Sequence, residues 1–109
     1  AHSCANPLTA EYGIVHGQAV GLMLPHVIRF NRQLPEIAAI YESYLNGDLA
    51  ERVVQLLQAA NLKTRLSELG VASARIPVLA QSAAKQWTAQ FTPRDVTEAD
   101  FVALYEAAM

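Results

Sequence analysis

Two of the three histidines in this chain, His2 and His16, are the residues best suited to chemistry. A neutral imidazole is a common ligand for iron, zinc and other divalent metals. His16 precedes Gly17 at an expected junction between a loop and a helix, where its ring can project from the helix N-terminus rather than along the helix side. The two histidines are therefore a candidate metal pair, and the alternative is that both are ordinary polar residues.

This pair is too small to form a metal site by itself. A bound metal takes three or four protein ligands, and the sequence has no HExxH motif, no CxxC pair and no carboxylate at an obvious spacing. A Ser-His-Asp pattern and a glycine-rich phosphate loop are also missing. His26 lies in an apolar segment, so we expect it in the core or half exposed. Cys4 is expected to be a buried, unreactive thiol.

Two aromatic residues and one arginine are further candidates. Trp87 ends an apolar stripe, which predicts a place in the core or an interface, with the wall of a substrate pocket as the alternative. Phe91 is the second candidate for a pocket wall. Arg94 is expected to cap a helix or to pair with Asp95 or Asp100.

Apolar residues recur at helical spacing, whereas the alternation typical of strands is almost absent. The first half of the chain predicts a helical end over 1–10 interrupted at Asn6-Pro7, a loop over 11–15, and a buried helix over 17–30 kinked or broken at Pro25. A helix opened by Pro35, a turn at Asn46-Gly47 and a helix that begins with a capping box of Asp48 and Glu51 follow. The second half predicts a short helix over 64–69 stopped by Gly70, a helix capped by Ser73 with Trp87 on its apolar face, a loop over 91–96, and a last helix capped by Thr97 and Asp100. Gly17 and Gly21 share a helix face and favour close packing. These elements predict one all-α, bundle-like domain over residues 1–109.

Composition excludes several classes of protein. The 109 residues are too few for two domains. The formal charge of -2 argues against a nucleic-acid-binding protein, which usually carries a basic surface. The sequence also contains no run of about 18 apolar residues, the length needed to span a membrane. One cysteine and no signal-peptide pattern lead us to expect a reducing compartment, the cytoplasm.

The low share of charged residues bears on whether the chain works alone or as part of a larger protein. Charged residues make up 17% of the sequence, against about 25% in typical proteins. An alanine-rich domain explains this, and so does a domain of a larger protein whose exposed face lies against a neighbour. The first residue is Ala rather than Met, so we expect either a processed start or a piece of a longer protein.

The strings around the histidines carry a resemblance to a known family. They are HSCANPL over 2–8, Tyr12, HGQAV over 16–20, LPHV over 24–27 and Phe30-Asn31. Together they resemble the iron-containing alcohol dehydrogenase family. The later strings LGV over 69–71, Ile76-Pro77, Leu79-Ala80, Pro93-Arg94 and 97–100 follow the order of that family's C-terminal end. The resemblance covers essentially the whole chain.

This resemblance implies the C-terminal, all-helical domain of an enzyme of the dehydroquinate synthase-like type. The preceding α/β domain of such enzymes binds NAD or NADP, and the reaction interconverts an alcohol with an aldehyde or ketone. A divalent metal, Fe²⁺ or sometimes Zn²⁺, is held by one Asp and three His, of which the last two match His2 and His16. The Asp and the first His have no counterpart in this chain, so we expect the 109 residues alone to be inactive.

The chain departs from the family signature at Asn6, where the family has a histidine near the nicotinamide and substrate. An amide donates and accepts hydrogen bonds but does not titrate near neutral pH, which argues against a proton relay there. Val15 and Thr9 replace a proline and a glycine. Two other functions stay open. One is a stand-alone helical module that lost catalysis and self-associates or binds a partner through an exposed face. The other is a maleylacetate reductase, which needs no metal.

Overall fold

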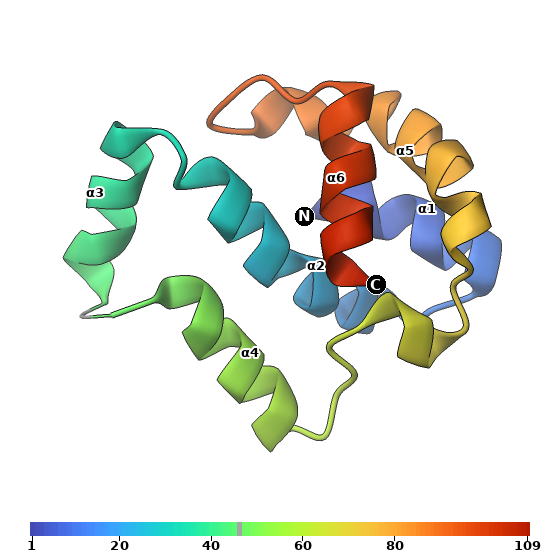
Figure 1. Ribbon diagram of the computed structural model, residues 1–109, viewed down its shortest axis with the longest axis horizontal. Helices are drawn as coiled ribbons and strands as arrows, with labels where there is room; N and C mark the ends of the chain where they lie inside the picture. The colour runs from blue at the N-terminus through green and yellow to red at the C-terminus, as the bar shows by residue number, and fades with distance from the viewer. Residues whose placement is uncertain (46) are drawn as a thin grey trace.

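The computed structural model describes residues 1–45 and 47–109. Within them lie the α-helices α1 (His2–Tyr12), α2 (His16–Asn31), α3 (Pro35–Tyr44), α4 (Leu49–Ala59), α5 (Ile76–Ala84) and α6 (Glu98–Ala108). The connections hold the 3₁₀ helices η1 (Leu66–Leu69), η2 (Ser73–Arg75) and η3 (Trp87–Phe91). No strand occurs in these residues, which confirms the all-α prediction (Figure 1). None of these helices is long and apolar enough to cross a membrane.

Four helices surround the core. α1 packs against α2 and α5, and α6 packs against α2 and α5 (Figure 1). The largest fully buried side chains at the centre are Leu8, Leu22, Met23, Leu66, Leu79 and Tyr105. Burying one such side chain stabilises the fold by about 1.5–3 kcal/mol. Ser3, Cys4 and Ala5, which follow His2 in the first turn of α1, are also buried, so the core holds this turn in place.

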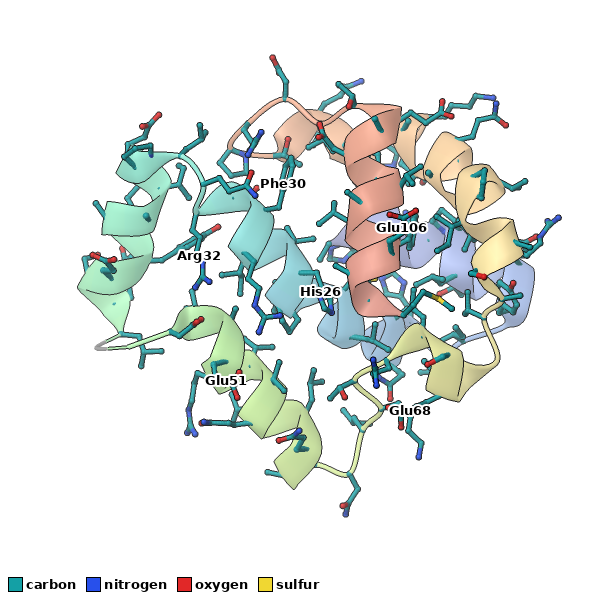
Figure 2. All side chains as sticks on the ribbon, in the orientation of Figure 1. His26, Phe30, Arg32, Glu51, Glu68 and Glu106 are labelled. Atoms are coloured by element: carbon teal, nitrogen blue, oxygen red, sulfur yellow. The ribbon has the colours of Figure 1, made fainter. Side chains whose placement is uncertain are left out.

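α4 packs on the outer side of α2, and Gly21 allows this approach. A Cβ at Gly21 would lie 3.1 Å from Cδ2 of Leu57, whereas a Cβ at Gly17 would meet no atom within 4 Å. The predicted close packing is thus confirmed at Gly21 and wrong at Gly17. Two ion pairs also join the α2 side to the α4 side: Arg29 with Glu51, and Arg32 with Asp48. Figure 2 labels one residue of each pair, Glu51 and Arg32. Because these pairs are exposed, they add little stability.

Two prolines lie inside helices without ending them. Pro7 is buried within α1 and Pro25 within α2, so the predicted interruption at Asn6-Pro7 and a break at Pro25 are wrong. An interior proline costs about 3 kcal/mol in lost hydrogen bonding and crowding. Burial of both rings and of their neighbours offsets this cost. α1 consequently runs to Tyr12 and ends at Gly13 (φ 65°), which shortens the predicted loop over 11–15 to three residues.

The second half of the chain contains shorter helical pieces than its sequence predicts. The predicted helix over 64–69 is the single 3₁₀ turn η1, which ends at Gly70 as expected. Ser73 makes no capping hydrogen bond; it begins η2, and α5 starts only at Ile76 with Pro77 in its first turn. Pro35 opens α3 as predicted. Asn46, in the predicted turn, lies outside the described residues.

Side-chain caps begin two of the three helices for which they are predicted. The Asp48 carboxylate accepts a hydrogen bond from the backbone N–H of Glu51 at 3.1 Å. At the start of α6, Thr97 and Asp100 form a reciprocal capping box: the Thr97 hydroxyl accepts from the Asp100 N–H at 3.2 Å, and the Asp100 carboxylate accepts from the Thr97 N–H at 2.9 Å.

We expect Thr97→Ala to lower the free energy of unfolding by about 1 kcal/mol, because the Asp100 N–H loses its acceptor at the start of α6. Thr97→Ser keeps the hydroxyl and should stay within a few tenths of a kcal/mol of the wild type. Urea unfolding of the three proteins measures both differences. Equal stability of Thr97→Ala and the wild type would contradict the role of the cap.

Candidate metal and substrate site

His2 and His16 meet because each is the first residue of its helix and α1 packs on α2. Their ring centroids are 5.2 Å apart, with 49° between the ring planes. Two imidazoles that bind one tetrahedral ion through metal–nitrogen bonds of about 2.0–2.1 Å hold their centroids about 5 Å apart. Both side chains are exposed and therefore accessible to an ion. The donor set and its spacing fit a shared Fe²⁺ or Zn²⁺ ion.

A complete site needs ligands from elsewhere. Within residues 1–45 and 47–109, no group of three His, Cys, Asp or Glu side chains is close enough to hold a metal ion. Both imidazoles also lie at helix N-termini, where the helix dipoles place partial positive charge. An anionic ligand from outside these residues would offset that charge and fill a third position.

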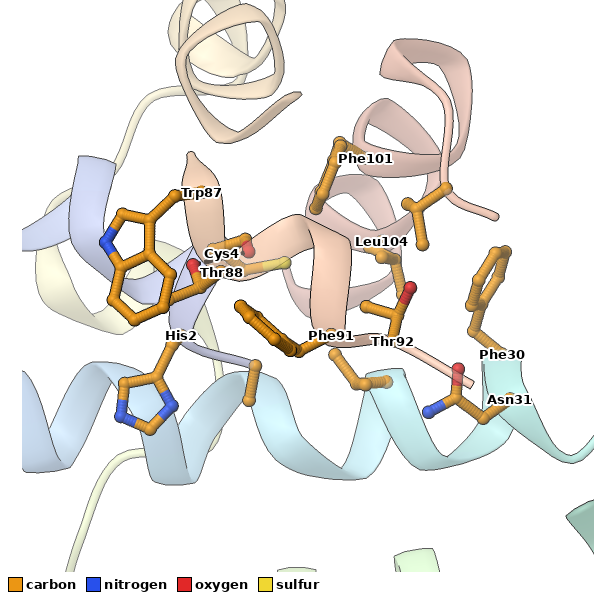
Figure 3. Close-up of a pocket in the computed structure, with 14 residues that line it drawn as sticks. His2, Cys4, Phe30, Asn31, Trp87, Thr88, Phe91, Thr92, Phe101 and Leu104 are labelled. Carbon is orange, nitrogen blue, oxygen red and sulfur yellow. Dashed lines mark hydrogen bonds between the residues drawn. The ribbon is translucent and has the colours of Figure 1, made fainter. Parts of the chain in front are cut away.

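A cavity of about 430 Å³ opens beside His2 between α1, α2, η3 and α6 (Figure 3). Most of its wall is apolar. The residues that line it include His2, Ser3, Cys4, Val27, Phe30, Asn31, Trp87, Thr88, Phe91, Thr92, Val96, Phe101 and Leu104. In Figure 3, His2 and Trp87 lie at one end, and Phe30 and Asn31 at the other. The predicted metal ligand and the predicted pocket residues thus border the same space.

Trp87 and Phe91 form the outer rim of this cavity. Their rings meet edge to face with centroids 5.7 Å apart, and their side chains are 68% and 75% exposed. Placement of Trp87 in the core is therefore wrong. Its place in an interface and its alternative role in a substrate pocket stay predictions, and Trp87 does line this cavity. α5 ends at Ala84, so the helical register that predicted a buried Trp87 stops before it. Phe91 belongs to η3 rather than to the predicted loop over 91–96.

Asn6 is engaged in a long-range hydrogen bond. Its Nδ2 donates to Oε1 of Gln86 at 3.0 Å, and in the preceding turn the Ser3 hydroxyl shares a 2.8 Å hydrogen bond with that of Thr88. Sequence reasoning missed Ser3, Gln86 and Thr88. Their partners are 80 or more positions away along the chain, so no local pattern marks them.

Arg94 supports the far wall of the cavity. It donates to the backbone oxygen of Phe30 at 3.1 Å and to Oε1 of Gln33 at 3.0 Å, and its guanidinium lies 3.9 Å from the Phe30 ring centroid. Because the Phe30 carbonyl lies in the last turn of α2, Arg94 caps a helix as predicted. The alternative, a pair with Asp95 or Asp100, is wrong, because Arg94 reaches across to α2 and Asp100 serves the cap of α6.

The remaining histidine and the cysteine lie as predicted. His26 is half-buried on α2; burial, and then the charge of Arg29, lower the pKa of its imidazole. Cys4 is 1% exposed, and burial raises the pKa of its thiol to about 12. The adjacent Tyr105 phenol, whose hydroxyl donates to the Cys4 carbonyl at 2.7 Å, also has a raised pKa because of burial.

We expect stability to fall above about pH 9, because the unfolded Cys4 thiol ionises near 9.0 and the folded one only near 12. Between these values the linked loss is on the order of 1.4 kcal/mol per pH unit, and Tyr105 acts in the same direction. Urea unfolding at about pH 8 and about pH 10.5 should show a smaller loss for Cys4→Ala than for the wild type. Equal losses in the two proteins would rule out a contribution from the thiol.

Known proteins resemble this chain over nearly its whole length. All 109 residues match the family described as Fe-containing alcohol dehydrogenase family, C-terminal. The chain is 32% identical over 120 residues to lactaldehyde reductase from Escherichia coli and 29% identical over 120 residues to 1,3-propanediol dehydrogenase from Klebsiella pneumoniae. Each alignment covers 98% of this chain and 31% of the relative, so the chain spans about a third of their length.

The fold agrees with these sequence relationships. A crystal structure of 1,3-propanediol oxidoreductase superposes with a TM-score of 0.79 at 28% sequence identity, over 99% of this chain and 32% of that one. The helical architecture and the sequence match cover the same residues. The chain therefore belongs to the iron-containing alcohol dehydrogenase family and corresponds to its C-terminal, helical domain.

Proposed function

We propose that residues 1–109 form the metal-binding helical domain of an NAD- or NADP-dependent dehydrogenase that interconverts a small alcohol with its aldehyde or ketone. One observation carries this proposal: His2 and His16 start two packed helices and hold their rings 5.2 Å apart. The names of the relatives, lactaldehyde reductase and 1,3-propanediol dehydrogenase, support the reaction class.

His2 and His16 would hold the metal, Fe²⁺ or Zn²⁺, through neutral ring nitrogens. When bound, the metal supplies Lewis-acid stabilisation of negative charge on the substrate oxygen, and the nicotinamide supplies the hydride carrier. The apolar cavity beside His2 receives the carbon body of the substrate and keeps water away from it. Trp87 and Phe91 form the wall where that body enters.

The remaining machinery lies outside these residues. The third and fourth metal ligands and the nucleotide-binding domain would come from the rest of a longer protein, as the share of the relatives covered by this chain suggests. We therefore expect the 109-residue chain alone to show no turnover. The buried, unpaired Cys4 agrees with a reducing compartment such as the cytoplasm.

The full-length parent protein tests this function. We expect about one Fe or Zn per chain and NAD- or NADP-dependent oxidation of 1,3-propanediol or a similar alcohol, lost on chelation and regained with the metal. Reduction of maleylacetate that survives chelation would favour the maleylacetate reductase type. Complete absence of turnover in a folded full-length protein would favour the interaction module.

A second measurement tests the metal ligands in the 109-residue chain. Calorimetric titration with Zn²⁺, or with Fe²⁺ under anaerobic conditions, should show weak binding that His2→Ala abolishes. Binding that persists unchanged in His2→Ala would place the metal elsewhere. Weak binding is expected because this chain supplies two of the usual three or four ligands.

A further inference from the structure

The aromatic rim of the cavity lies on a segment that burial alone does not hold in place. Trp87 and Phe91 are both mostly exposed, and their rings meet edge to face. Within η3 only the small side chain of Ala89 packs against the core. Since the hydrophobic effect acts weakly on side chains that remain exposed, other contacts must determine where the two rings lie relative to His2.

Two side-chain hydrogen bonds tie this segment to α1, one on each side of Trp87. The Asn6 amide bonds Gln86, immediately before Trp87, and the Ser3 hydroxyl bonds Thr88, immediately after it. Both bonds are partly buried, which reduces competition from water. Ser3 and Asn6 lie one and four residues after His2 on α1, so the start of this helix holds both the candidate ligand and the aromatic rim.

We propose that Asn6 is a positioning residue that, together with Ser3, fixes Trp87 and Phe91 beside His2 and thereby sets which alcohols the cavity accepts. The second half of this inference rests on the proposed function. With the substrate oxygen near His2, the carbon body runs past an aromatic rim into an apolar cavity of about 430 Å³. Because each buried methylene strengthens binding, such a wall favours alcohols with an apolar body of several carbons.

The single tryptophan makes the positioning measurable in the 109-residue chain. Its indole N–H gives one NMR cross-peak, and its fluorescence reports how easily acrylamide reaches the ring. We expect Asn6→Leu to move this cross-peak and to increase quenching, and Gln86→Leu to do the same. Because both remove one shared bond, the double variant should add little beyond either single change.

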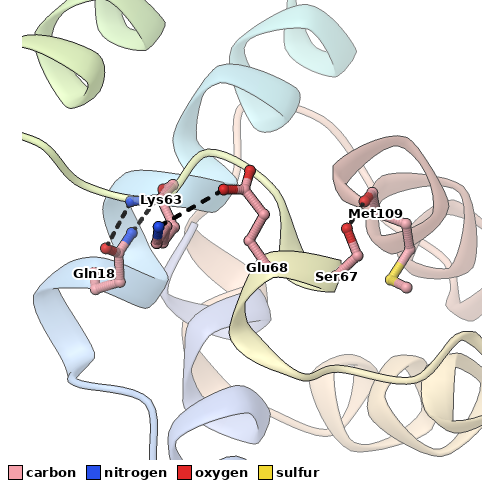
Figure 4. A network of polar contacts seen from close by, with 5 residues as sticks. All are labelled: Gln18, Lys63, Ser67, Glu68 and Met109. Carbon is pink, nitrogen blue, oxygen red and sulfur yellow. Dashed lines mark hydrogen bonds and ion pairs between the residues drawn. The ribbon is translucent and has the colours of Figure 1, made fainter.

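Rescue and control variants separate positioning from a general loss of stability. Asn6→Asp keeps an acceptor toward which the Gln86 amide can turn, so its quenching should stay close to the wild-type value. Gln18→Leu is the matched control: the Gln18 amide also makes a long-range bond, to the backbone of Lys63, but away from η3 (Figure 4). Gln86 lies outside every α-helix and tests the same bond if Asn6→Leu does not fold.

These measurements decide the positioning role. A displaced cross-peak and increased quenching in Asn6→Leu and Gln86→Leu, but not in Gln18→Leu or Asn6→Asp, support it. Indole signals in Asn6→Leu and Gln86→Leu that match those of Gln18→Leu overturn it.

The full-length parent protein tests the selectivity. In Asn6→Leu, the kcat/KM for 1-hexanol relative to that for ethanol should fall roughly tenfold. The pH–rate profile should stay unchanged, because an amide carries no titrating proton. A constant ratio despite a displaced indole overturns the role in selectivity, and a shifted pH–rate profile, which displacement of the rim alone does not produce, overturns positioning as the role of Asn6. If the parent oxidises no alcohol, the proposed function fails, while the indole measurements still decide the positioning.

Discussion

His16→Ala in the full-length parent protein should reduce both metal content and turnover by more than about 100-fold. Loss of a residue that only supports a ligand already costs about 10- to 100-fold in metal affinity or activity, so loss of a ligand should cost more. His16 is exposed at the start of α2, and truncating its side chain leaves the core intact. We therefore expect stability to stay within about 0.5 kcal/mol of the wild type.

His26→Ala is the matched control for this experiment. It changes the same residue type on the same helix, ten residues or about 15 Å farther along α2. Metal content by mass spectrometry and turnover with NAD or NADP should remain near wild-type values in this variant. If His16→Ala retained full metal and full turnover, His16 would not belong to the site.

Tyr105→Ala should lower the free energy of unfolding by about 3–5 kcal/mol, the usual range for truncating a large buried aromatic residue. Tyr105 is 0% exposed, and its hydroxyl donates to the backbone oxygen of Cys4 at 2.7 Å. It thus joins the last helix to the helix that carries His2. Since small domains are stable by only about 5–15 kcal/mol, this loss would leave a substantial fraction of molecules unfolded under mild denaturing conditions.

Two variants separate packing from hydrogen bonding in this effect. Tyr105→Phe removes only the hydroxyl and should cost about 1 kcal/mol. Tyr44→Ala removes the same side chain at a position that is 84% exposed, where we expect a change within about 0.5 kcal/mol. Urea unfolding compares the three. A loss for Tyr105→Ala as small as that for Tyr44→Ala would show that α6 is not held to α1 in this way.

The sequence by itself determined the features that depend on neighbouring residues. Thr97 and Asp100 form the predicted capping box within one helical turn, so their residue types are sufficient to predict it. Of the box predicted for Asp48 and Glu51, the half in which the Asp48 carboxylate accepts from the Glu51 N–H is observed. Pro35 and Gly70 mark a helix start and a helix end for the same local reason. The family was also readable from short strings around the histidines, and the comparisons confirm it.

Only the tertiary structure decided the features that depend on distant residues. Pro7 and Pro25 stay inside helices because burial in the core outweighs the helix-breaking cost of an interior proline. The sequence alone shows that cost but not the burial. The early end of α5 moved Trp87 from the expected core to the rim of a cavity.

The candidate site shows the same division. His2 and His16 were identifiable as imidazoles, but the packing of α1 on α2 sets their 5.2 Å separation. The bond from Asn6 to Gln86 joins residues 80 positions apart and has no signature in either neighbourhood. A local sequence pattern predicts only interactions between residues within about one helical turn. A site assembled from several elements depends on contacts that form only when those elements pack.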